Sequence, residues 1–134
     1  MYLLDTMVLS ELRKKERNQG MTAWISDKPD RHLFISVVSV GEIAKGIAQQ
    51  DKQDKVYAAT LRQWLEKLLL LYSNRILPVN IPTAKRWGEI SARVNNGGAD
   101  VLIAATAIEN NLSVVTRNEK HFSRTGVKII NPWQ

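Results

Sequence analysis

The chain has 134 residues, of which none is cysteine and only two, His32 and His121, are histidine. The lack of cysteine excludes disulfides, Cys-ligated zinc, iron–sulfur clusters and thiol nucleophiles, and it fits a reducing compartment. Two histidines are too few for a His-rich zinc site. Any metal bound by this chain would therefore be held mainly by oxygen atoms.

Long hydrophobic runs are also missing. Unbroken aliphatic runs, such as residues 68–71 and 101–105, are only four or five residues long, whereas a membrane-spanning helix needs about 20 apolar residues. Asp5 stands where a signal peptide would need apolar side chains. We therefore expect no membrane segment, no targeting segment and a cytoplasmic location.

Several common catalytic motifs are absent. The sequence contains no phosphate-binding G-x-x-x-x-G-K-[ST] loop, no dinucleotide-binding G-x-G-x-x-G, no H-E-x-x-H zinc motif and no G-x-S-x-G nucleophile elbow. The chemistry of the chain has to be sought in other residues.

What the chain does have is positive charge and a globular composition. Lys and Arg number 19 against 13 Asp and Glu, which gives a net charge of +6, and 44% of the residues are hydrophobic. Such a surplus favours polyanionic partners, nucleic acid first, although solubility alone would also account for it. The length predicts one domain over residues 1–134.

Short β-rich apolar runs alternate with longer segments of helical spacing. The expected strands are 2–4, 33–38, 76–79, 112–115 and 127–130, and the expected helices are 6–15, 21–27, 39–49, 54–72, 83–94 and 99–109. Continuous apolar strands separated by helices indicate a parallel sheet covered on both faces. The predicted fold is a single three-layer α/β/α domain with a central parallel sheet of about five strands. Ligands in such sheets bind at the carboxyl ends of the strands.

Polar residues follow several of these strands or begin helices, and each has a purely structural explanation. Asp5 ends the first strand and is a favourable N-cap for the helix after it. Glu42 completes an S-x-x-E pattern with Ser39, which is typical of a capping box. Asp100 precedes an apolar, buried helix that it would cap. Asn118 fits an Asx-turn or the N-cap of a short helix that ends near residue 122.

Taken together, these residues favour a metal site. Asp5, Glu42, Asp100 and Asn118 are all expected at one edge of the sheet. Clustered carboxylates repel one another, and burial raises that cost, so the group needs a cation. Oxygen ligands select hard ions such as Mg²⁺ or Mn²⁺, which can activate water against a phosphodiester. The basic surface supplies the electrostatics for a nucleic-acid substrate.

The segments that carry these residues resemble the PIN-domain family, specifically the VapC-type toxins of type II toxin–antitoxin systems. The matching stretches are LLDTMVLSEL (3–12), ISVVSVGEI (35–43), DVLIAATA (100–107), VTRNEKHF (115–122), GV (126–127) and NPW (131–133). They run through essentially the whole chain in order. No single stretch is decisive, but their combination and spacing are highly specific.

The resemblance implies a toxin that is a Mg²⁺-dependent or Mn²⁺-dependent endoribonuclease. By position, Asp5, Glu42 and Asp100 match the three principal acids of the family, with Asp5 and Asp100 as the main metal ligands. Asn118 matches a fourth position that is often Asp, and its amide brings no charge. We expect Thr6 and Thr116 to support the site. Arg117 would hold the RNA backbone.

Two local features depart from the family. Met7 replaces the small polar residue common after the Asp-Thr pair, and the loop 95–98 is shorter than usual. His121 either contacts RNA beside the site or is an ordinary surface residue.

The resemblance also implies partners. VapC-type toxins typically form homodimers and are inhibited by a cognate antitoxin, with which they make a hetero-oligomer. Two other functions remain open: a catalytically weak member that binds RNA or a partner protein, and a nuclease of the same chemistry that acts on DNA.

Overall fold

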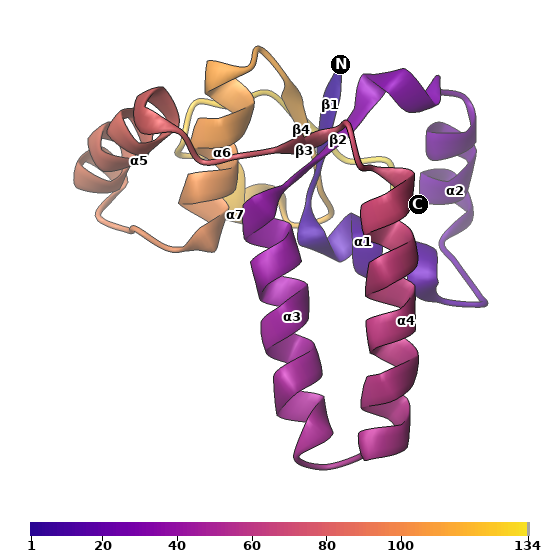
Figure 1. Ribbon diagram of the computed structural model, residues 1–134. Coiled ribbons are helices and arrows are strands. Elements are labelled where there is room, and N and C mark those ends of the chain that lie inside the picture. Colours follow the sequence, from indigo (N-terminus) through magenta and orange to yellow (C-terminus); the bar gives the residue numbers. More distant parts are fainter. Residues whose placement is uncertain (134) are drawn as a thin grey trace.

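A computed structural model describes residues 1–133, so the last residue of the predicted domain, Gln134, lies outside the described part. A five-stranded parallel sheet forms the centre (Figure 1). The strands are β1 (Tyr2–Leu4), β2 (Leu33–Ser36), β3 (Ile76–Leu77), β4 (Ser113–Val115) and β5 (Ile129–Ile130). They are arranged in the order β3-β2-β1-β4-β5, and every neighbouring pair is parallel. The predicted fold class is confirmed.

Helices lie on both sides of the sheet. They are α1 (Thr6–Arg13), α2 (Gln19–Ser26), α3 (Val37–Asp51), α4 (Lys55–Leu71), α5 (Ile81–Val94), α6 (Ala99–Glu109) and α7 (Glu119–Phe122), with a 3₁₀ turn at Asp30–His32. α3 and α4 run side by side as a long hairpin that projects from the body (Figure 1). Among residues 1–133, no helix combines the length and the apolar character needed to cross a membrane.

The start of α3 corrects one sequence prediction. Ser36 is the N-cap, and its hydroxyl accepts the backbone N–H of Val38 at 3.0 Å. The helix therefore begins at Val37, and the predicted capping box between Ser39 and Glu42 is wrong. Val37 and Val38 favour a strand by composition, but they form the first turn of the helix because the Ser36 cap initiates it.

The start of α5 is a second correction. Asn80 is the N-cap, and its side chain accepts the backbone N–H of Thr83 at 3.1 Å. The helix begins at Ile81 instead of Thr83, with Pro82 in its first turn, where a missing N–H costs nothing. β3 ends at Leu77 because Pro78 cannot donate to the ladder.

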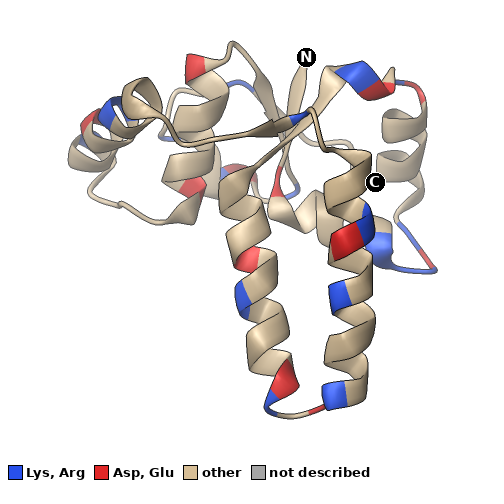
Figure 2. Cartoon of the chain, in the orientation of Figure 1, with Lys and Arg blue, Asp and Glu red and all other residues tan. Residues whose placement is uncertain are grey.

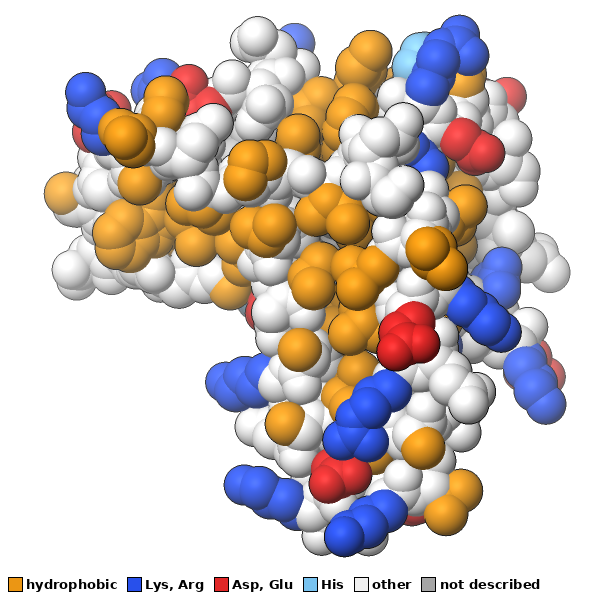
Figure 3. Space-filling model, in the orientation of Figure 1, with side chains coloured by type: hydrophobic (Ala, Val, Ile, Leu, Met, Phe, Trp, Pro, Cys, Tyr) orange, Lys and Arg blue, Asp and Glu red, His pale blue; other side chains and the backbone are white. Residues whose placement is uncertain are grey.

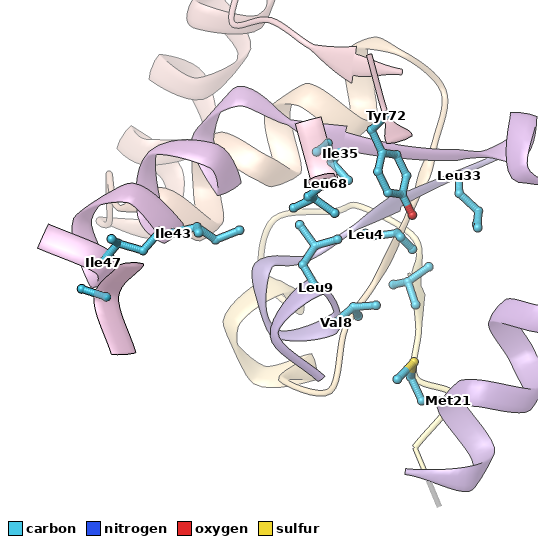
Figure 4. Packing of buried hydrophobic residues seen from close by; sticks show 12 residues of the cluster. Leu4, Val8, Leu9, Met21, Leu33, Ile35, Ile43, Ile47, Leu68 and Tyr72 are labelled. Carbon is cyan, nitrogen blue, oxygen red and sulfur yellow. The ribbon is translucent and has the colours of Figure 1, made fainter. Parts of the chain in front are cut away.

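The core has two main clusters, one on each face of the sheet, and a smaller third cluster between α5 and α6. Neighbouring strand residues point to opposite faces, so Leu4 and Val115 belong to one cluster, and Leu3 and Val114 belong to the other. Figure 4 shows the first cluster, in which side chains from β1, α1, β2, α3 and α4 meet. The second cluster joins Phe122 of α7 to α6 and the sheet.

Candidate active site

Asp5 is the buried centre of the predicted site. It directly follows β1, and only 3% of its surface is exposed. Its Oδ1 accepts the backbone N–H of Thr6 at 2.7 Å, which caps α1, and its Oδ2 accepts the hydroxyl of Thr116 at 2.8 Å. The predicted cap role of Asp5 is therefore confirmed. Two donors hold the carboxylate in one orientation.

The environment of Asp5 disfavours its charge. Burial raises the pKa of the carboxyl from 3.8 to about 6, against the hydrogen bonds from Thr116 and Thr6, which lower it. The negative charges of Asp100 and Glu42 raise the pKa further. Asp100 and Glu42, both distant from Asp5 in sequence, are thus each within electrostatic reach of Asp5.

Glu42 joins the site through hydroxyl groups. The hydroxyl of Thr6 lies 2.7 Å from Oε1 of Glu42 and 2.7 Å from Oγ of Ser39. Because a carboxylate only accepts, Thr6 donates to Glu42 and Ser39 supplies the hydrogen of the second contact. The Ser39 side chain is fully buried, whereas Glu42 is exposed.

Ser39 is a further site residue, which the sequence pattern indicates only as a helix cap. Its spacing of three from Glu42 places both on one face of α3, and this spacing was the available signal. The hydroxyl of Ser39 instead supports the Thr6–Glu42 contact.

Asp100 lies in the first turn of α6 and does not cap it. Gly98 occupies the N-cap position, without a side-chain hydrogen bond, so the predicted cap role of Asp100 is wrong. Its Oδ2 lies 2.8 Å from Nδ1 of His121, an exposed residue of α7. The amino end of a helix favours a negative charge at this place. His121 is therefore a surface residue that also reaches the candidate site.

Thr116 links the centre of the site to the β4–α7 loop. The buried hydroxyl donates to Asp5 and accepts the backbone N–H of Asn118 at 2.9 Å. Asn118 stands at the N-cap position of α7, as one of its interpretations predicted, but its side chain makes no capping bond. Arg117 is exposed, and its charge is one of the smaller causes that lower the pKa of Glu11; the largest is the backbone N–H of Asn18.

The carboxylate oxygens of the site are the type of ligand that a hard divalent cation prefers, but in this structure the carboxylates contact other side chains. Within residues 1–133, no three His, Asp or Glu side chains stand close enough together to hold an ion. His121 holds Asp100, and Thr6 holds Glu42. The pKa of Asp5 is raised by burial and, to a smaller extent, by the charges of Asp100 and Glu42, so a cation beside it would be favourable. The donor set fits Mg²⁺ or Mn²⁺.

Two hollows adjoin these acids. One, of about 280 Å³, is lined by Thr6 and Glu42 and by residues of α1, α3 and α4. The other, of about 500 Å³, is lined by Asp100 and by residues of α5, α7 and the turn after α7. A ligand can therefore approach the acids from two directions.

The chain is similar to known proteins over its full length. A family model described as "PIN domain" matches residues 2–128. "VapC ribonuclease Y4jK" of Sinorhizobium fredii is 31% identical over 100% of this chain and 99% of its own length. "Toxin FitB" of Neisseria gonorrhoeae is 33% identical over 99% of each chain. The crystal structure of FitAcB from Neisseria gonorrhoeae matches with a TM-score of 0.87 and 31% identity, over 100% of this chain and 99% of that one. A family model that matches residues 2–128, together with relatives more than 30% identical along the whole chain, shows that the chain belongs to the PIN-domain family.

Proposed function

We propose that this chain is a metal-dependent endoribonuclease that acts as the toxin of a type II toxin–antitoxin pair. The observation that carries the proposal is the carboxylate of Asp5, whose pKa is raised chiefly by burial and further by the nearby charges of Asp100 and Glu42. The similarity to a protein named as a ribonuclease and to one named as a toxin supports the substrate and the biological role.

Asp5, Asp100 and Glu42 would hold Mg²⁺ or Mn²⁺. When bound, the cation supplies an activated water and offsets charge that develops on the phosphodiester. Thr6 orients Glu42, and Thr116 fixes Asp5.

Two more residues would complete the reaction site. Asn118, held by its backbone to Thr116, would orient water beside the acids without adding charge. Arg117, exposed on the β4–α7 loop, would hold the RNA backbone.

The partners follow from the same proposal. A toxin of this kind forms a homodimer and a hetero-oligomer with its antitoxin, and we propose both for this chain.

Metal dependence tests the enzymatic proposal. A labelled single-stranded RNA should be cleaved in Mg²⁺ or Mn²⁺, should stay intact in EDTA, and should be cleaved again when either ion is restored. Ca²⁺ should not restore cleavage because it is larger and tolerates irregular coordination. Full cleavage in the chelator would show a metal-free mechanism and refute the proposal.

Two alternatives predict other results in the same assay. A catalytically weak PIN-domain protein, which the uncharged Asn118 would favour, binds RNA but leaves it intact in every metal. A DNA-directed nuclease cleaves a DNA strand of the same sequence and spares the RNA, since the 2′-OH distinguishes the two.

A further inference from the structure

The hollow beside Asp100 has a lining of mostly uncharged residues, in which basic side chains outnumber acidic ones. Its walls include Asn95 and Asn96 after α5, Asp100 in α6, and Lys120 and Arg124 around α7. We call it the α7 pocket. A volume of about 500 Å³ is within the range of pockets that enclose small organic ligands and is sufficient for one nucleotide unit.

Charge in the α7 pocket favours an anion beside the acids. Lys120 and Arg124 are both exposed and bring two positive charges. The single carboxylate in the lining, Asp100, is already in contact with His121. Asn95 and Asn96 add side-chain amides that can donate hydrogen bonds to phosphate oxygens.

The wall that carries Lys120 and Arg124 is fixed in place. Phe122, between them in the sequence, is fully buried against the core formed with α6. The guanidinium of Arg93 in α5 donates to the backbone carbonyls of Arg124 at 2.8 Å and Thr125 at 3.0 Å. The two cations therefore project from a preorganised backbone, which reduces the ordering cost of binding.

Positive charge alone does not single out this pocket. Figure 2 shows Lys and Arg also on the α3–α4 hairpin and after α1. A second pocket of about 500 Å³, lined by Met1, Ser113 and Lys128, lies where β1 and β4 begin, which is the opposite end of the sheet from Asp5. The α7 pocket differs from that second pocket because Asp100 belongs both to its wall and to the acidic site. It differs from the hollow beside Glu42 because it offers two exposed cations, whereas the one cation in that lining, Arg13, already donates to the hydroxyl of Tyr57.

We propose that the α7 pocket binds the backbone phosphates of an RNA strand immediately beside the bond that is cleaved, and that Lys120 and Arg124 make the phosphate contacts. The proposal deepens the proposed function and rests on it. In this proposal, the RNA strand runs from the acidic site toward Lys120 and Arg124.

Binding measured without cleavage tests this assignment. A fluorescent single-stranded RNA is titrated with the full chain in EDTA over a range of salt concentrations. The slope of log affinity against log salt is negative, and each lost phosphate contact should make it less steep by about 0.7. At ~0.1 M salt this change corresponds to roughly a fivefold loss of affinity. Lys120→Ala and Arg124→Ala should each show this loss, and the double variant should lose roughly 25-fold.

Matched variants separate a specific contact from a general loss of charge. Lys128→Ala removes one exposed lysine from the pocket at the opposite end of the sheet and should leave affinity and slope unchanged. Lys120→Arg keeps the charge and should retain most of the affinity. Circular dichroism checks that every variant is folded.

Three results would overturn the proposal. They are no binding of RNA by the wild-type chain, equal losses in Lys120→Ala and Lys128→Ala, and losses that appear with a DNA strand but not with RNA. Failure of the proposed function looks different. RNA that binds through Lys120 and Arg124 but is never cleaved in Mg²⁺ or Mn²⁺ would support the α7 pocket and refute the nuclease. Metal-dependent cleavage by the wild type, with unchanged RNA binding in Lys120→Ala and Arg124→Ala, would support the nuclease and refute the role of the α7 pocket.

Discussion

Asp5 combines a structural and a chemical role in one side chain. As an N-cap it stabilises the start of α1, and as a buried anion beside two other acids it destabilises the metal-free protein. The two interpretations of Asp5 that the sequence allowed are therefore compatible with each other. Cap statistics could identify the first role, whereas the second depends on burial and on neighbours far away in the sequence.

Asp5→Asn should make the stability of the metal-free protein less dependent on pH. The pKa of Asp5 is about 6 in the folded chain against 3.8 ordinarily, so the folded state binds the proton more readily. The wild type thus loses stability as the pH rises from about 4 to about 6, and the Asn variant avoids this loss. At pH 7 the variant should be more stable by on the order of 2 kcal/mol.

Urea unfolding in chelator at pH 4 and pH 7 measures this difference. Glu66→Gln, which removes a charge from an exposed position of α4, is the control for net charge. Asn is as good an N-cap as Asp, so a variant that is less stable than the wild type at pH 7 would show that the hydrogen bonds which the charged carboxylate accepts from Thr6 and Thr116 outweigh its electrostatic cost.

Asn118→Asp should tighten metal binding. The two side chains have nearly the same shape, and the side chain of Asn118 is not engaged in capping α7. An added carboxylate near Mg²⁺ gains on the order of 1–4 kcal/mol before repulsion and desolvation are subtracted. We expect a net gain of roughly tenfold in affinity, about 1.4 kcal/mol. Calorimetric titration of both proteins with Mn²⁺ measures it, and equal or weaker binding would mean that Asn118 points away from the metal.

At the scale of elements, local signals predicted which elements exist better than where they begin. Every expected strand and helix is present. The predicted strand extended into α3 because Val37 and Val38 are β-branched and favour a strand. Only the position of the N-cap at Ser36 shows that they form the first turn of a helix. Placing the cap at Ser36 required knowing which hydroxyl meets Val38.

The contacts that assemble the site could not be read from local pattern. Thr6 and Glu42 are 36 residues apart, and Thr116 and Asp5 are 111 apart. The rule that ligands gather at the carboxyl ends of parallel strands placed these residues at one edge. It did not specify that His121 would meet Asp100, because that contact depends on how α7 packs against α6.

Thr116→Val should loosen the connection between β1 and the β4–α7 loop. It removes the donor to Asp5 and the acceptor for the backbone N–H of Asn118, both at a fully buried position. Leaving such groups unpaired should cost about 2–4 kcal/mol of unfolding free energy. Chemical denaturation in chelator measures the loss.

Thr116→Ser is the matched control because it keeps the hydroxyl and loses one methyl group. It should cost only about 1 kcal/mol. Equal losses in the Val and Ser variants would show that packing, and not the two hydrogen bonds, sets the importance of this residue.

At the scale of the whole molecule, the sequence predicted the net charge and the single-domain fold, but it could not predict which apolar side chains lie on the surface. Figure 3 shows apolar side chains gathered over α5 and the seam between α3 and α4. Leu70 and Ile81 are each 77% exposed. Which apolar residues stay at the surface is decided by tertiary packing. The homodimer therefore stays a prediction from family resemblance.

The most direct test of the account compares cleavage of one 5′-labelled single-stranded RNA by the wild type and by Asp100→Asn at saturating Mg²⁺. The substitution removes a charge and keeps the shape of a residue that touches His121 and lies within electrostatic reach of Asp5. We expect Asp100→Asn to fold and to bind the RNA at least as tightly as the wild type, but not to cleave it. Cleavage by Asp100→Asn at the wild-type rate would contradict the assignment of the acidic site.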